Sequence, residues 1–511
     1  MWTGIHFTSA AWATEMLKRS KGADLVLSFR QRILGDGVVY GQLIEQGSVE
    51  QLKEVLNQMH RVQDISLNAV TTAELEALFH GLEVEAPRLR SLSIKSTSSL
   101  PPYSRFSFEE PRYTLPIEFL CGGLPPRLQR LELVGCALPW QQGTPRLFSS
   151  NLTSLLLVDS EEAIQRPTLT QLLDALTTLP ALRRLELEYI LSSTQNTINS
   201  LPRSDRVAHL SQLQCLRLKG ACLHCVGLLN SLSFPVTATI KVECDPPQER
   251  LEGCSALMDS LSKCRGSVLR PKKLTISDLS PHSASFCMKM WDKANSIEKE
   301  TSCFTCSLQI DMQERQGFSG TQSMEKALRV LIGPLDLHSL RELEVLSTRW
   351  NEYEWRTFFG RLPQLSRILL RDTGAEYFVG AMVPLLDTGT KRQVQSRTYF
   401  PSLKSLSLDC IQFREDNGLD VEMFVDTLML RAEYGASLYE LAISKAIELF
   451  PEDVSLLKEV VASVTWDGIV DDGLEHGHSE SYDDEDYYDE DDDEEEYDDE
   501  EEYDEEDYGG Y

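Results

Sequence analysis

The sequence predicts an α/β solenoid, in which short parallel strands line the concave side of a horseshoe and helices lie outside. Two observations predict it. The spacing Leu-x-x-Leu-x-Leu recurs along most of the chain, and segments with apolar residues at helical spacing lie between its copies. One such unit cannot bury its own leucines, so neighbouring units must stack.

The strand pattern is explicit in five segments. Apolar residues at alternate positions bury one face of a short strand, and a leucine three residues earlier closes the corner that leads into it. The five segments are Leu128/Leu131/Leu133, Leu152/Leu155/Leu157, Leu182/Leu185/Leu187, Leu213/Leu216/Leu218 and Leu403/Leu406/Leu408. Further strands are expected at Leu25–Leu27, Val62–Leu67, Leu89/Leu92/Ile94, Leu340/Leu343/Val345, Leu365/Ile368/Leu370 and Leu438/Leu441/Ile443.

A long gap separates Leu213 from Leu340. Weaker apolar alternation inside it predicts three more strands, near Thr239–Val242, Leu274–Ile276 and Leu308–Ile310. We expect these strands to follow one another at the pitch of their neighbours, so that strand and helix alternate throughout the body.

Helices are expected between the strands because apolar residues recur there at intervals of three and four after a polar start. The predicted helices are 10–20, 48–60, 168–176, 251–264, 324–332, 353–362 and 421–432. The unit Leu128–Leu138 matches the full core of a leucine-rich repeat, with Cys136 where Asn or Cys satisfies turn backbone groups. The other units resemble the irregular, longer repeats of leucine-rich-repeat proteins of the F-box type.

Composition divides the chain into three parts: an N-terminal cap (1–60), the solenoid (61–466) and a tail (467–511). The formal net charge is −31, but 25 of the 80 acidic residues lie in 471–511, which has no Lys or Arg. Between Asp483 and Asp507, 21 of 25 residues are Asp or Glu and the rest are Tyr, so the tail is expected to be disordered. The body is close to neutral, which argues against direct nucleic-acid binding.

The compartment follows from the cysteines and from the first residues. Twelve cysteines in a chain without a leader segment or a long apolar run indicate reduced thiols in an intracellular protein of the cytoplasm or nucleus, without membrane insertion.

The opening part of the chain contains three short motifs, namely Trp2–Phe7, Met16-Leu17-Lys18-Arg19-Ser20 and Ala23–Leu27. In this order they resemble the segment that follows the F-box in F-box proteins of basidiomycete fungi. The resemblance implies a substrate-recognition arm of a cullin–RING ubiquitin ligase that binds an unidentified protein substrate. The family's F-box precedes this segment, so an adaptor-docking module is expected to be missing here, and binding of a Skp-type adaptor is expected only if an upstream F-box exists.

No pattern of residues indicates an enzyme, a cofactor or a metal site. Cys222/Cys225 and Cys303/Cys306 are two C-x-x-C pairs, but 77 residues separate them, too far for a zinc finger, so we expect buried thiols. His476 and His478 are expected to be solvated. Walker, nucleophile-elbow and dinucleotide motifs are absent from the sequence.

The remaining candidate site is the concave face of the sheet, which carries the side chains between the buried leucines. It should present alternating acidic and basic groups, which favours a protein or peptide partner. Its predicted residues are Arg130, Glu132, Arg184, Glu186, Glu188, Arg217, Lys219, Glu342, Glu344, Arg367, Arg371, Ser405, Ser407 and Asp409. An alternative function rests on the tail, because acidic leucine-rich nuclear phosphoproteins also combine such repeats with an acidic tail and bind histones and other basic proteins.

Overall fold

The computed structural model divides the chain into two units, Met1–Asp471 and Asp472–Tyr511. The described residues all belong to the first unit. They are 4–6, 10–30, 53–82, 84–96, 113–116, 119–120, 125–159, 166–191, 206–244, 252–266, 268–280, 285–291, 304–309, 329–347, 350–384, 398–414 and 418–470. The predicted tail beyond 470, with His476 and His478, lies outside the described residues, as do Cys303 and parts of the helices predicted at 48–60 and 324–332.

One sheet dominates the described part of the chain, where it contains seventeen strands. From one edge it begins with β1 (Gly4–His6), β2 (Leu25–Arg30), β3 (Val62–Val70), β4 (Ser91–Ser96), β6 (Arg130–Val134), β8 (Ser154–Val158), β9 (Arg184–Glu188), β11 (Cys215–Gly220) and β13 (Thr239–Cys244), all paired in parallel. It ends with β17 (Glu342–Leu346), β18 (Arg367–Arg371), β19 (Ser405–Asp409), β20 (Glu440–Ser444) and β21 (Ser463–Trp466), again in parallel. Two short parallel pairs, β5 (Tyr113–Thr114) with β7 (Cys136–Ala137) and β10 (Ala208–His209) with β12 (Leu232–Ser233), lie outside the sheet. The predicted parallel sheet is therefore confirmed over both of these stretches.

The centre of the sheet departs from the prediction. The strands predicted near 240, 275 and 309 exist as β13, β14 (Lys273–Ser280) and β16 (Phe304–Gln309), but β15 (Ser285–Trp291) pairs antiparallel with both β14 and β16. The spatial order is β13, β16, β15, β14, β17. The expectation that strand and helix alternate throughout was thus wrong here, because apolar alternation predicts a buried strand face and not the direction of pairing.

The predicted leucines form continuous buried rows across the sheet. Leu92, Leu131, Leu155, Leu185 and Leu216 occupy neighbouring register positions and are fully buried. Each removes a branched apolar side chain from water, which is worth about 1.5–3 kcal/mol relative to an exposed one. This row extends through more than one unit, so each strand completes the core of its neighbour.

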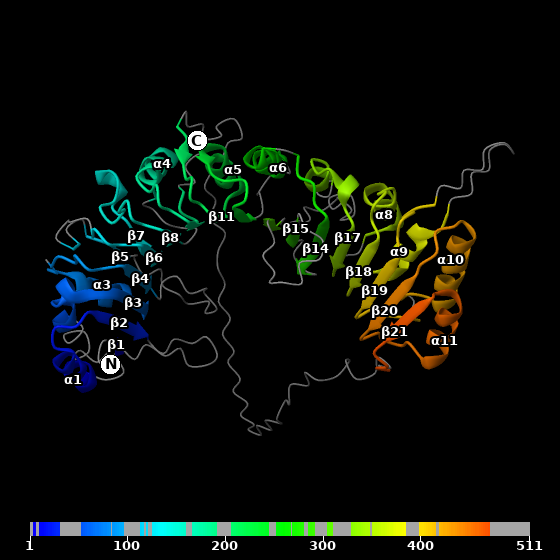
Figure 1. Ribbon diagram of the computed structural model, residues 1–511, viewed down its shortest axis with the longest axis horizontal. Coiled ribbons are helices and arrows are strands. Elements are labelled where there is room, and N and C mark those ends of the chain that lie inside the picture. Colours follow the sequence, from blue (N-terminus) through cyan, green and yellow to red (C-terminus); the bar gives the residue numbers. More distant parts are fainter. Residues whose placement is uncertain are drawn as a thin grey trace, which may run out of the picture. The chain divides into compact units, whose positions relative to one another are not determined.

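Helices cover the buried side of the sheet (Figure 1). They are α1 (Ala10–Ser20), α3 (Thr72–Phe79), α4 (Leu169–Thr177), α5 (Cys222–Ser231), α6 (Glu252–Arg265), α8 (Glu352–Phe358), α9 (Ala375–Met382), α10 (Val421–Glu433) and α11 (Pro451–Val460). Capping boxes start three of them, at Thr71, Thr168 and Asn351. The helices predicted at 10–20, 168–176, 251–264, 353–362 and 421–432 are confirmed within four residues at each end. Within the described ranges, none of these helices has the length and apolarity needed to cross a membrane.

The strands leave the sheet through a repeated turn. The residue directly after the strand has a positive φ in six cases, namely Gly135, Tyr189, Ser347, Asp372, Cys410 and Lys445. The amides of five of them donate a hydrogen bond of 2.9–3.1 Å to a carbonyl at the end of the next strand. At the other end, the amides of leading leucines such as Leu152 and Leu182 donate to a carbonyl three residues earlier. The backbone therefore repeats one kind of corner before and another kind after several of the described strands.

Candidate functional site

The side chains that alternate with the buried apolar rows form the surface that we call the strand face. All fourteen predicted residues lie on it, at positions that flank the buried residues of their strands. Thirteen are half-buried or exposed, whereas Glu186 is only 2% exposed. The burial pattern thus places these side chains between the buried residues of their strands, and their role in binding a partner stays a prediction.

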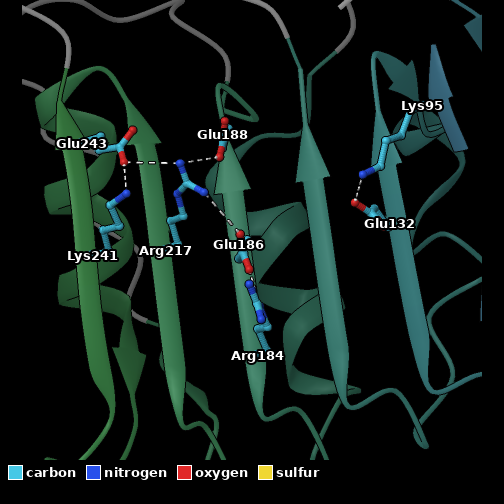
Figure 2. A network of polar contacts seen from close by, with 8 residues as sticks. All are labelled: Lys95, Glu132, Arg184, Glu186, Glu188, Arg217, Lys241 and Glu243. Atoms are coloured by element: carbon cyan, nitrogen blue, oxygen red, sulfur yellow. Dashed lines mark hydrogen bonds and ion pairs between the residues drawn. The ribbon is translucent and has the colours of Figure 1, made fainter. Parts of the chain in front are cut away.

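Arg217 on β11 is the centre of a charge network (Figure 2). Its guanidinium lies 3.4 Å from Glu188, 3.8 Å from Glu186 and 3.3 Å from Glu243. Glu186 also pairs with Arg184 on its own strand. The network thus joins β9, β11 and β13, and Arg217 holds carboxylates from the strands on both sides.

Glu243 receives a second cation from its own strand. The Lys241 ammonium lies 2.6 Å from the Oε1 atom that Arg217 also approaches. Partial burial of Glu243 opposes ionisation, but the hydrogen bond from Lys241 and the charges of Lys241, Arg217 and Lys219 outweigh it and lower the pKa of Glu243. For Arg184, the hydrogen bond to Glu186 raises the pKa against the effect of burial. Both shifts keep the network ionised.

Pairs between neighbouring strands also occur toward both ends of the sheet. The Glu132 carboxylate lies 2.7 Å from the Lys95 ammonium (Figure 2). It also accepts a hydrogen bond of 2.9 Å from the Ser93 hydroxyl. Glu344 accepts a hydrogen bond of 2.9 Å from Thr275 and lies 3.4 Å from Lys273. The strand face is therefore organised by contacts across strands.

Two more pairs lie on the last strands. Arg367 pairs with Glu342, and the Arg371 Nε atom lies 2.5 Å from Asp409. Burial opposes ionisation of Asp409, but hydrogen bonds from Ser444 and Arg371 lower its pKa. An open hollow of about 480 Å³ lies beside this pair. Its lining includes Leu369, Arg371, Ser407, Asp409, Ala442 and Thr465.

The sequence reasoning missed several members of the strand face. Lys95, Lys241, Glu243, Lys273 and Lys289 were not among the predicted residues, although they contribute charge to the same surface. Apolar alternation was a usable signal for two of them, because Lys241 and Glu243 stand between the buried Ile240, Val242 and Cys244. They were not predicted because the spacing Leu-x-x-Leu-x-Leu, on which the other strand-face positions were assigned, does not occur in this part of the sequence.

The remaining predicted members have weaker contacts. The Lys219 ammonium lies 5.5 Å from the centre of the Tyr189 ring. Arg130 is exposed and has no ionic partner within the described ranges, and Ser405 and Ser407 are half-buried. These groups are available for contacts with another molecule.

The first C-x-x-C pair is buried beneath the strand face. Cys222 and Cys225 lie on α5, both are about 4% exposed or less, and both contact the buried Cys244 thiol at the end of β13. Hydrogen bonds that the neutral Cys244 thiol donates to these two thiols, together with complete burial, raise the pKa of Cys244. Over the described ranges, no group of three or more His, Cys, Asp or Glu side chains is arranged to hold a metal ion.

Comparison with known proteins adds no assignment, because neither a protein-family model nor a curated protein sequence matches this chain. What the strand face offers chemically is a set of ion pairs and hydrogen-bonding groups on a rigid sheet. Such groups can recognise the charge pattern of another molecule.

Proposed function

We propose that the first unit is an irregular leucine-rich-repeat solenoid that acts as a non-enzymatic protein-binding receptor. We further propose that it serves as an F-box-like substrate-recognition arm of an intracellular cullin–RING ubiquitin ligase. The observation that carries the receptor role is the strand face, on which charged side chains from most strands are held in fixed positions by contacts with neighbouring strands.

Repetition of the backbone supports the solenoid. A residue with a positive φ directly follows six of the described strands. Buried leucines share one register from β4 to β11. In a repeat array each unit contacts only its neighbours, so the side chains between the leucines become a surface that grows with each added unit.

Pre-organisation supports the binding role. Lysine and arginine lose rotamer entropy when a partner immobilises them, at a cost of about 0.5–1.5 kcal/mol per side chain. Arg217, Lys241 and Arg371 are already fixed by carboxylates, so part of that entropy is lost on folding and not on binding. A protein partner with a complementary charge pattern would gain from this arrangement.

The ubiquitin-ligase assignment rests on the resemblance at the N-terminus. The resemblance implies a helix that carries Met16–Ser20 and a strand that follows Ala23. These residues end α1 and lead into β2, respectively. The helix and the strand thus lie where the resemblance implies them, which supports the proposed ligase role.

An affinity purification tests both parts of the proposal. The full chain would be purified from fungal cells beside a strand-face variant, Arg130→Glu with Ser407→Arg, and a matched helix-side variant, Lys458→Glu with Ser255→Arg. We expect a partner protein that is lost only from the strand-face variant. Cullin and Skp-type adaptor subunits are expected only from a fourth sample, in which an upstream F-box segment is added to the chain. Partners that are retained by the strand-face variant would contradict the receptor role. Absence of cullin and adaptor from the chain with the added F-box segment would contradict only the ligase assignment.

The composition of residues 471–511 favours a second candidate function, the binding of histones or other basic proteins. This segment contributes 25 acidic residues and no Lys or Arg. A polyanion attracts basic proteins with a strong dependence on salt. A histone pull-down at increasing salt should lose its signal when residues 471–511 are deleted, and an unchanged signal would rule out this candidate.

A further inference from the structure

We propose that the centre of the strand face, on strands β11, β13, β15 and β14, binds an acidic segment of a partner protein. We call this surface the cationic centre and define it by Arg217, Lys219, Lys241, Lys273 and Lys289. The inference rests on the proposed receptor function and specifies the chemistry of its partner.

The cationic centre concentrates positive charge. Its four strands carry five cations on the strand face, whereas Glu243 is the single acid among their described strand-face positions. Arg217 and Lys241 occupy directly opposite register positions on β11 and β13. Like charges in that position destabilise a sheet, so stability alone does not favour this arrangement. An anionic ligand would neutralise the excess charge.

Lys289 is the cation best placed for such a ligand. It is exposed, and within the described ranges no carboxylate pairs with it. Its register neighbours are Thr305 on β16 and Thr275 on β14, and Lys241 lies opposite Thr305 on the next strand. Lys241 and Lys289 are thus two strands apart, about 10 Å, with a neutral residue between them.

The departure from the parallel order produces this cluster. Lys289 belongs to β15, the antiparallel strand inserted between β14 and β16. In a plain parallel array there would be no strand at this place and no cation. The Lys273 ammonium lies over the ring of Trp291, which is on the same strand as Lys289, and is 5.0 Å from the centre of that ring. Trp291 thus adds an aromatic surface beside the charges.

The flanks of the cationic centre favour a short peptide over a long polyanion. Glu186 and Glu188 border it on β9, and Glu342 and Glu344 border it on β17. A uniformly anionic polymer that crossed the face would be repelled by both borders. Five strands lie between the borders and span about 19 Å at the usual strand spacing, which matches about six residues of extended chain.

Fluorescence anisotropy with a fluorescein-labelled hexaglutamate peptide tests the inference. The peptide would be titrated with the full chain at low ionic strength, with Lys289→Glu and with the control Lys458→Glu, which makes the same charge change on α11. We expect Lys289→Glu to weaken binding about five- to tenfold and the control to change it less than about twofold. Since Lys289 is exposed and pairs with no carboxylate of the part of the chain that the structure describes, its variant should keep the hydrogen-exchange protection of β15.

Each other outcome has a distinct meaning. Equal binding by the wild type and Lys289→Glu, or no binding by either, would overturn the inference. Tighter, Lys289-dependent binding of a hexauridylate RNA would also overturn it, in favour of a nucleic-acid ligand. If a partner protein is lost from the Arg130→Glu/Ser407→Arg variant while the peptide does not respond to Lys289→Glu, the receptor function stands and only the acidic ligand is wrong.

Discussion

Lys241 and Glu243, two residues apart on β13, form an ion pair of 2.6 Å on the strand face. The same carboxylate oxygen lies 3.3 Å from Arg217 on β11, the residue directly opposite Lys241. Glu243 therefore forms ion pairs with two cations that the register of the sheet places directly opposite each other. The stability of this part of the sheet should depend on the charge of Glu243.

Substitution of Glu243 by Gln should lower the free energy of unfolding by about 1 kcal/mol. The amide keeps the shape of the side chain but leaves Arg217 and Lys241 as opposed like charges. Urea unfolding measures the change. Glu440→Gln on β20 is the control, because Glu440 is an exposed strand-face glutamate without an ionic partner in the part of the chain that the structure describes. Equal losses for both variants would contradict the role of Glu243.

Acid should weaken the fold partly through the same carboxyl group. The pKa of Glu243 is lower in the folded chain than its ordinary value of 4.5, so the unfolded chain takes up the proton first as the pH falls. The stabilisation is complete above that value and is lost as the pH falls through the lower, folded pKa. Unfolding free energies measured from about pH 7 down to about pH 3.5 should converge for the wild type and Glu243→Gln. A constant difference across that range would contradict this prediction.

The conformation of Gly220 gives a third prediction. Its φ is +137°, a region that other residues rarely adopt, and a Cβ atom there would meet Tyr189 only at ordinary contact distances of 3.6–3.7 Å. Backbone strain is therefore the cost of Gly220→Ala, and it should lower the free energy of unfolding by about 1–3 kcal/mol. In the control Gly22→Ala, whose Cβ would meet no atom within 4 Å, the free energy of unfolding should not fall and should rise by up to about 1 kcal/mol. Comparable losses in the two variants would show that strain is not the cause.

The buried rows could be predicted from the sequence because burial in a strand depends on local alternation. Leu155 and Leu185 follow from their own segments alone. The direction of β15 could not, although Met288 and Met290 alternate with Lys289 as in other strands. Whether such a strand pairs parallel or antiparallel depends on which neighbour it meets, and β15 is reached through a connection of only four residues from β14.

On the strand face, too, the sequence predicts which side chains share a surface but not which of them contact one another. Parity along the strand predicted that Arg217 and Glu186 face away from the helices. The ion pairs depend on register between separate units, which the spacing of the leucines leaves open. Arg217 and Glu243 are 26 residues apart, and Thr275 and Glu344 are 69 apart. Such contacts are determined by the assembled sheet.

Arg431, in the last turn of α10, is fully buried. Its guanidinium donates hydrogen bonds to the carbonyl oxygens of Tyr399 at 2.7 Å and Phe400 at 3.0 Å, in the segment that leads into β19. Burial lowers its pKa to about 10, so the side chain remains charged at neutral pH. The arginine thus joins a helix to the corner of a neighbouring unit.

Arg431→Met should lower the free energy of unfolding by about 2–4 kcal/mol. Methionine fills much of the volume but removes the donor to the Tyr399 carbonyl and one of the two donors to the Phe400 carbonyl, which also accepts from the Leu403 amide. Arg431→Lys should recover only part of the loss, because one compact ammonium lacks the planar fork that serves both carbonyls. Chemical unfolding measures the stability, and hydrogen exchange of residues 398–403 should rise in the methionine variant. The exposed Arg361 provides the control, since Arg361→Met should change stability by less than about 0.5 kcal/mol. If Arg431→Met is as stable as that control, the two carbonyls do not need the arginine, and α10 must be held to β19 by apolar contacts alone.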